Sequence, residues 1–257
     1  MMDLHTHTTF CDGKDTPEAM VIAALDKGMD CLGFSGHSHT FFDESYCMSP
    51  LGTVAYRGEI ARLRREYGTR LRILCGVEQD RYSAQPTAGY DYVIGSVHYL
   101  RLGEEYLPVD ESPEISRDIV ERYFGGDWYA MAEAYYRTVS GVVENTGCHI
   151  ISHFDLIAKF NEKYPAFDEI HPRYIAAWQT ALDTLLLSNR PFEINTGAMA
   201  RGWRTQPYPR REMIEYILSR GGRLILSSDS HSTDTLCYGF TRYEREYPSL
   251  IRSFRDI

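Results

Sequence analysis

Short apolar runs alternate with longer helical patterns along this sequence. The runs are bounded by polar or turn-forming residues, and they cover residues 3–7, 31–35, 71–77, 92–97, 149–152, 191–195 and 223–227. Such alternation is typical of βαβ units, in which helices connect parallel strands. We therefore predict an α/β barrel with seven parallel strands. Because 257 residues suffice for one barrel of this kind, we predict a single domain over residues 1–257.

Helix signals lie between the apolar runs. Proline or capping residues at the start and glycine at the end predict helices over residues 16–28, 49–68 and 128–145, and two later helices with Pro172 and Pro209 in their first turns. Residues 99–126 show no sustained period and contain glycine, proline and acidic residues. We predict a long loop there, which covers one end of the barrel as part of a lid.

Most histidines lie where a predicted strand ends. The chain has nine histidines, and seven lie at or just past the carboxyl end of a strand: His5, His7, His37, His39, His98, His153 and His231. Carboxylates share these ends, namely Asp12, Glu78, Glu193 and Asp229. Parallel barrel strands bring these ends to one face, where active sites are built. A single histidine at a strand end is as often a hydrogen-bonded core residue as a ligand. Many imidazoles and carboxylates packed together without a cation, however, would perturb one another's protonation.

The spacing of these residues indicates a metal site. His5 and His7 are two residues apart on a strand, so both imidazoles point to the same side and can share one ion. Asp229 and His231 repeat this spacing on the last strand, which a closed barrel places beside the first. Imidazole and carboxylate ligands without thiolate suit Zn, Mn or Fe. The number of candidates exceeds the need of one ion, so we predict two or three divalent metal ions.

Charge and composition restrict the partners. The formal net charge of -9 disfavours a broad basic surface for nucleic acid. The six cysteines are scattered and form no CxxC pair, which favours reduced thiols in the cytoplasm. No apolar run is long enough to span a membrane, and the first residues lack signal-peptide features. We therefore expect a cytoplasmic protein that acts on a small molecule; its oligomeric state stays open.

In order along the chain, these motifs resemble the polymerase and histidinol phosphatase (PHP) superfamily, and within it the histidinol-phosphate phosphatases. The matching segments span nearly the whole chain: His5-Thr6-His7, Asp12, Gly33-Phe34-Ser35-Gly36-His37-Ser38-His39, Gly76-Val77-Glu78, Gly95-Ser96-Val97-His98, Ser152-His153-Phe154-Asp155-Leu156, Glu193-Ile194-Asn195-Thr196 and Ser228-Asp229-Ser230-His231. Asp12 stands where many members have histidine, and Gly36 replaces an acidic residue that often precedes the next histidine. Neither change removes a ligand.

The resemblance implies a distorted (β/α)7 barrel, TIM-like and of the PHP type, with three divalent metal ions (Zn, Mn or Fe). The family's ligands carry over to nine residues. His5, His7, Glu78 and Asp229 would hold the first ion, Glu78 would bridge to a second ion held by His98 and His153, and Asp12, His37 and His231 would hold the third. The implied activity is that of a phosphoric monoester hydrolase, which converts L-histidinol phosphate to L-histidinol and phosphate in histidine biosynthesis.

Further roles are expected around the phosphate. Glu78 and Asp229 are expected to be catalytic as ligands beside the reacting group, and Lys159 and Arg201 are expected to bind substrate phosphate. His39 is expected to bind substrate or to protonate the leaving alkoxide. Glu193, with Asn195 on the same strand face, is expected to orient ligand histidines rather than to ligate.

Three alternatives compete with this interpretation. The first is a PHP phosphoesterase that cleaves nucleoside bisphosphates or short oligonucleotides. The second is a metal-binding PHP module without catalytic activity, which the complete ligand set disfavours. The third is an amidohydrolase, which would need a lysine at a strand end where this chain has Glu78.

Overall fold

The sheet has the predicted seven strands. The computed structural model describes residues 1–257, and the strands are β1 (Met2–Asp3), β2 (Cys31–Phe34), β3 (Arg72–Asp80), β4 (Tyr92–Ser96), β7 (Ile150–Ile151), β8 (Phe192–Asn195) and β9 (Leu224–Ser227). All neighbouring pairs are parallel, in the order β1-β2-β3-β4-β7-β8-β9. The two edges meet beyond β1 and β9, where Thr6 bridges Ser230 and the His7 amide donates to the Ser230 carbonyl at 2.8 Å. The predicted seven-stranded barrel is therefore confirmed.

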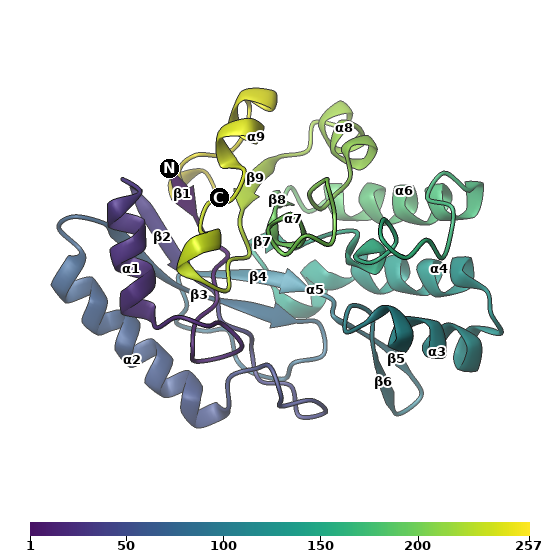
Figure 1. Cartoon of the computed structure of the whole chain (residues 1–257), viewed down its shortest axis with the longest axis horizontal. Coiled ribbons are helices and arrows are strands. Elements are labelled where there is room, and N and C mark those ends of the chain that lie inside the picture. Colours follow the sequence, from purple (N-terminus) through teal and green to yellow (C-terminus); the bar gives the residue numbers. More distant parts are fainter.

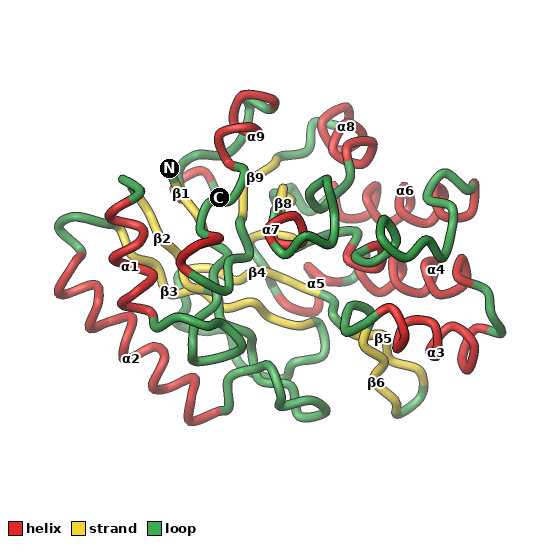
Figure 2. Tube along the Cα trace, viewed as in Figure 1, coloured by secondary structure: helices red, strands yellow, loops and turns green.

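Helices surround the strands. They are α1 (Pro17–Asp26), α2 (Pro50–Tyr67), α3 (Pro113–Phe124), α4 (Trp128–Val139), α5 (Val142–Thr146), α6 (Pro172–Leu186), α7 (Gly197–Ala200), α8 (Arg211–Ser219) and α9 (Phe240–Glu246). Figure 1 shows α1 and α2 on one side of the sheet and α3, α4 and α6 on the other, and Figure 2 shows the strands enclosed between them. None of the helices is long and apolar enough to cross a membrane.

Side-chain caps explain where the early helices begin. The Thr16 hydroxyl accepts from the Ala19 amide at 3.2 Å, and the Ser49 hydroxyl accepts from the Gly52 amide at 3.0 Å. Each cap is followed by a proline at the first helical position, where the missing N–H costs nothing. The sequence signals for these two helices are confirmed.

Three sequence predictions about local structure are wrong. Residues 99–126 are not a loop, because they form the hairpin β5 (Tyr99–Leu102) and β6 (Glu105–Pro108) followed by α3. The strands of this hairpin are only four residues each, too short to show a period. Residues 128–145 split into α4 and α5 at Ser140 and Gly141. Pro209 precedes α8, which begins at Arg211.

The barrel interior is apolar at the amino ends of the strands. A cluster of eight buried residues fills it: Met2, Leu4, Cys31, Leu74, Tyr92, Ile94, Ile150 and Ile225. Tyr92 is the largest of them, and its hydroxyl donates to the carbonyls of Leu4 and Phe34. A Cβ on Gly33 or Gly76 would lie 2.3 Å from Tyr92, so glycine is required at both positions. Because this apolar cluster fills the amino end of the barrel, the polar residues of the interior lie at the opposite, carboxyl end.

Candidate metal centre

Glu78 lies at the centre of the polar end of the barrel. Its carboxylate is 1% exposed, and imidazole nitrogens from five histidines lie around it. The distances are 3.1 Å to His5 Nε2, 3.4 Å to His7 Nε2, 3.0 Å to His37 Nδ1, 3.3 Å to His98 Nε2 and 3.1 Å to His153 Nε2. Burial alone would raise the pKa of Glu78, but His5, His37 and His98 hold it well below its usual range. The carboxylate is therefore ionised.

Asp229 brings a second carboxylate to the same histidines. Its Oδ1 lies 3.3 Å from His7 Nε2 and 3.7 Å from His5 Nε2. Its Oδ2 accepts from Arg201 Nη2 at 3.0 Å. Burial opposes ionisation, but Arg201 and His5 hold the pKa of Asp229 well below its usual range. The first and last strands thus supply a shared, negatively charged site.

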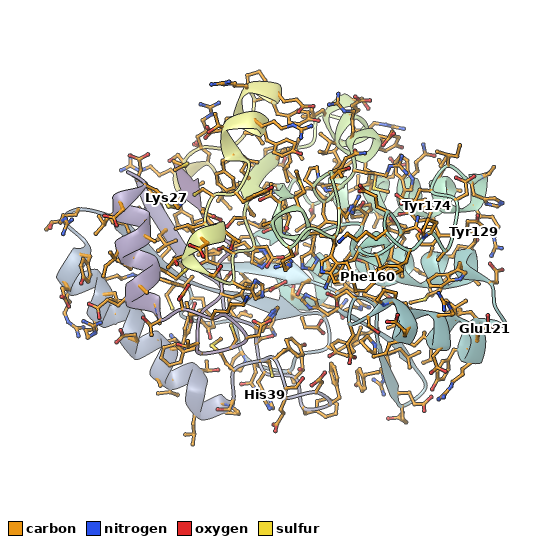
Figure 3. The ribbon with its side chains drawn as sticks, viewed as in Figure 1. Lys27, His39, Glu121, Tyr129, Phe160 and Tyr174 are labelled. Atoms are coloured by element: carbon orange, nitrogen blue, oxygen red, sulfur yellow. The ribbon has the colours of Figure 1, made fainter.

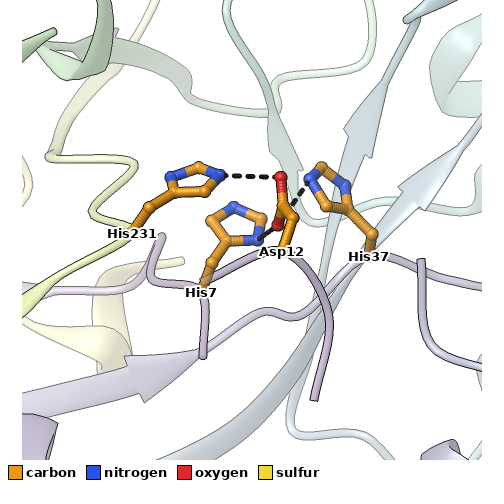
Figure 4. A group of neighbouring side chains, drawn as sticks. All are labelled: His7, Asp12, His37 and His231. Atoms are coloured by element: carbon orange, nitrogen blue, oxygen red, sulfur yellow. Dashed lines mark hydrogen bonds and ion pairs between the residues drawn. The ribbon is translucent and has the colours of Figure 1, made fainter. Parts of the chain in front are cut away.

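Asp12 supplies the third carboxylate, which lies closer to solvent than those of Glu78 and Asp229. Its oxygens lie 3.2 Å from His231 Nε2, 3.6 Å from His37 Nε2 and 3.7 Å from His7 Nδ1, as Figure 4 shows. The His7 and His231 rings stack at a centroid distance of 4.2 Å. The pKa of Asp12 is lowered, because His37 and His231 outweigh its burial.

The residues fall into three sets whose ligand atoms lie within 4.8 Å of one another. The sets are His7, Asp12, His37 and His231; His5, His7 and Asp229; and His37, Glu78 and His98. His7 and His37 each belong to two sets, whereas the family pattern assigned each to one ion. His153 lies outside these sets but contacts Glu78.

The chemistry of the residues fits bound divalent cations. His7 Nε2 is buried without a hydrogen-bond partner, although two carboxylate oxygens lie within 3.4 Å. Burial, with the neighbouring His231 and His37, lowers the pKa of His7 to about 3, whereas carboxylates outweigh burial and raise the pKa of His5 and His98, so ligation by these two would release protons. A cation between these atoms would bind the nitrogen and the oxygens together, whereas the hydrogen bonds of the metal-free site leave His7 Nε2 without a partner.

Carboxylates behind the histidines orient the rings. Glu193 Oε1 lies 2.7 Å from His5 Nδ1, which leaves His5 Nε2 directed at Glu78. Asn195 Nδ2 donates to the other Glu193 oxygen at 3.1 Å. This geometry agrees with the predicted orienting role and is the usual support of a ligand imidazole.

Sequence reasoning missed Asp80. Its Oδ2 accepts from the His98 amide at 3.1 Å and lies 3.4 Å from His98 Nδ1. The available signal was its position two residues after Glu78, which places both side chains on one face of β3. Asp80 thus lies behind the His98 ring as Glu193 lies behind His5, but at a longer distance that leaves His98 Nδ1 without a hydrogen bond.

A cavity of about 360 Å³ opens over the cluster. Lys159 and Arg201 both line it, as predicted for substrate-binding residues. Lys159 Nζ donates to Asp110 Oδ2 at 2.8 Å, and Arg201 Nη1 donates to the Asp229 carbonyl at 3.1 Å. Asp43, Tyr99, Asp110 and Glu111 also line the cavity, so the hairpin and the segment after it border the site.

His39 does not line this cavity. Its Nε2 lies 2.7 Å from Glu44 Oε1, and Figure 3 shows the residue among the loops at the lower edge of the molecule. The other proposed site residues lie together, but the structure does not bring His39 to them.

Comparison with known proteins identifies the family. A family model described as the PHP domain matches residues 3–196. The chain belongs to the PHP family. The predicted resemblance to PHP proteins is therefore confirmed, and the match includes Glu78 and all but two of the nine candidate ligands, Asp229 and His231.

Relatives of this PHP chain extend over its whole length. A curated Deinococcus radiodurans protein named "Probable histidinol-phosphatase" is 28% identical over 271 residues, which cover 100% of this chain and 94% of the relative. A Listeria monocytogenes crystal structure with the provisional name histidinol phosphatase hisK has a TM-score of 0.82 at 20% identity, with coverage of 95% of this chain and 100% of that one. A Lactococcus lactis histidinol phosphate phosphatase, crystallised with Zn, L-histidinol and phosphate, has a TM-score of 0.64 at 22% identity, covering 90% and 86%. Both structures share the PHP barrel fold.

Proposed function

We propose that this PHP chain, as a single domain, hydrolyses L-histidinol phosphate to L-histidinol and phosphate with the help of three divalent cations. The cluster of five imidazoles around the buried Glu78 carboxylate, at the base of a cavity, is the observation that carries the proposal. The full-length similarity to a curated probable histidinol-phosphatase supports the substrate. The proposed ligands are His5, His7, Asp12, His37, Glu78, His98, His153, Asp229 and His231.

The residues of the site would have different roles in hydrolysis. When bound, the cations polarise the phosphoryl oxygens and lower the pKa of the attacking water from about 15.7 to about 7. Glu78 and Asp229 would stay ionised beside them, because a nearby cation favours the charged form of a carboxylate. Arg201, at the cavity wall, would donate to a phosphate oxygen and offset charge in the transition state. His39 is left out of this proposal, because its ring is bonded to Glu44 outside the cavity wall.

The charge of the cavity favours an amino alcohol as the leaving group. Asp43, Asp110 and Glu111 line the same cavity as the metal cluster, and Lys159 pairs with Asp110 alone. L-Histidinol phosphate carries an ammonium group that these carboxylates would attract. A nucleoside bisphosphate would instead bring a second anionic phosphate toward them. The electrostatics of the cavity therefore support histidinol phosphate over the nucleotide alternative.

A substrate panel tests the proposal. The protein is loaded with Mn or Zn, and phosphate release is measured from L-histidinol phosphate, a nucleoside 3′,5′-bisphosphate and an aryl phosphate. We expect kcat/KM to be at least about 100-fold higher for L-histidinol phosphate, because the other two lack the ammonium group. Preference for another ester would refute the substrate, and the absence of hydrolysis with metal bound would favour a non-catalytic module.

The Glu111→Gln variant tests the acidic residues of the cavity, with the aryl phosphate as the control substrate. Glu111 is exposed and is not among the proposed metal ligands, so its loss should raise KM for L-histidinol phosphate by about threefold, the size of one exposed ion pair. The aryl phosphate should be unaffected. An equal change for both substrates would show that the acidic residues of the cavity do not recognise the ammonium group.

A further inference from the structure

The Asp3 carboxylate lies fully buried at the seam where the barrel closes, and no arginine or lysine pairs with it. Its Oδ1 accepts from the amides of His5 at 3.3 Å and Ser228 at 3.1 Å. Its Oδ2 accepts from the Ser228 hydroxyl and from the Cys237 amide at 3.3 Å. One side chain of the first strand therefore holds the backbone of the last strand and of the segment after it.

We call these four hydrogen bonds of Asp3 the Asp3 clamp. Asp229 directly follows Ser228, which the clamp holds. Its φ is 49°, in the left-handed region that non-glycine residues rarely adopt. Ser228, on one side, is held by Asp3 through both its amide and its hydroxyl. Ser230, on the other side, donates its amide to the His5 carbonyl at 3.2 Å and accepts from the His7 amide. The unfavourable conformation persists because both neighbours are fixed.

We infer that Asp3 is a positioning residue for the metal centre, which holds Asp229 in its left-handed conformation so that the carboxylate faces the imidazoles of His5 and His7. Asp3 touches neither substrate nor the ligand atoms and acts through the backbone of Ser228 and His5. The inference rests on the proposed metal ligation by His5 and Asp229, but not on the identity of the substrate. It assigns a function to a buried acid that the hydrolysis itself does not use.

The role requires a carboxylate rather than any polar side chain. Three amides and one hydroxyl point at the two oxygens, so both must accept hydrogen bonds. The amide nitrogen of asparagine would be a donor facing at least one backbone N–H that it cannot bond. Asp3→Asn therefore keeps the shape of the side chain but leaves at least one of these backbone amides without its acceptor.

The test measures Zn²⁺ affinity of the full chain, stripped of metal, by competition with a chromophoric chelator. Asp91→Asn is the matched control, because Asp91 also accepts from a backbone amide, that of Cys75 at 2.6 Å, but lies at the amino end of β4. We expect Asp3→Asn to weaken Zn²⁺ binding by about 10-fold to 100-fold, the loss seen when support of a ligand is removed. Asp91→Asn should leave the Zn²⁺ affinity unchanged.

The outcomes separate positioning from stability. If metal-free Asp3→Asn melts at a lower temperature but binds Zn²⁺ with wild-type affinity, the inference is overturned. If Asp3→Asn does not fold, Ser228→Ala decides, because it removes one bond of the clamp and keeps every charge. Weakened Zn²⁺ binding in Ser228→Ala supports the inference, and unchanged binding overturns it. A wild-type chain that binds no Zn²⁺ would instead refute the proposed metal centre.

Discussion

Replacing Glu78 with glutamine should lower kcat/KM for L-histidinol phosphate by at least about 10³-fold, the upper end of the loss when one group that acts in the transition state is removed. The substitution preserves the size of the side chain but removes a charge that five imidazoles surround. A neutral amide is a poor ligand for a divalent cation, so metal content should fall together with activity. Steady-state kinetics and elemental analysis of the same preparation measure both effects.

The control for this variant is Glu59→Gln on α2. Glu59 pairs with Arg62 on the same helix and lies outside the cavity. We expect its kcat/KM to stay within about twofold of wild type, as for most surface substitutions. If Glu78→Gln retained full metal and more than a tenth of the activity, the proposed bridging role of Glu78 would be wrong.

The strands were predictable because each contains a short apolar run, and all but β3 and β4 are separated from the next strand of the sheet by at least one helix. Their ends were less predictable. The apolar run at residues 71–77 stops before Glu78, whereas β3 continues to Asp80. The last three residues are all polar and buried, but only Glu78 and Asp80 face the histidines, whereas Gln79 donates to the carbonyls of Ser83 and Gln85. Because the apolar run stops short of Asp80, the role of this residue behind His98 went unrecognised.

Spacing rules succeeded where the backbone stays extended and failed where it does not. His5 and His7 face the same cluster, as their spacing on a strand predicts. These two residues flank Thr6, which bridges Ser230, whereas His37 itself bridges Glu78 and His39 lies in the loop beyond that bridge. The loop there is shaped by contacts such as that of the Thr40 hydroxyl with the Asp43 carbonyl at 2.7 Å, and His39 turns to Glu44. No periodic pattern encodes such a loop.

The division of the ligands among ions also depends on distances that the sequence does not contain. The family pattern gave each histidine to one ion. In the structure the His7 imidazole lies close to both Asp12 and Asp229, and His37 lies close to both Asp12 and Glu78. Long-range closure of the barrel creates these shared positions, since Asp12 and Asp229 are distant in sequence.

Removing the bound cations with a chelator should abolish hydrolysis and lower the unfolding temperature by roughly 10 °C. A ligand that binds only the folded state at 1,000 times its Kd stabilises it by about 4.1 kcal/mol. For a chain of this size, about 1 kcal/mol shifts the unfolding temperature by roughly 2–4 °C. The buried carboxylates Glu78 and Asp229 and their histidines come from distant strands, so a bound cation would join these strands. Thermal denaturation with and without the chelator measures the shift.

Adding single metal ions back to the metal-free protein shows whether the imidazoles or the carboxylates dominate metal binding. Added Zn²⁺ or Mn²⁺ should recover both activity and stability, whereas Mg²⁺ should recover little, because it prefers oxygen ligands and the cluster is rich in imidazole. Hydrolysis that persists after elemental analysis shows no metal would contradict the proposed mechanism. Equal recovery with Mg²⁺ would mean that the carboxylates Asp12, Glu78 and Asp229, rather than the histidines, dominate binding. Recovery limited to Zn²⁺ and Mn²⁺ would assign the affinity of the centre to the imidazoles that its strands bring together.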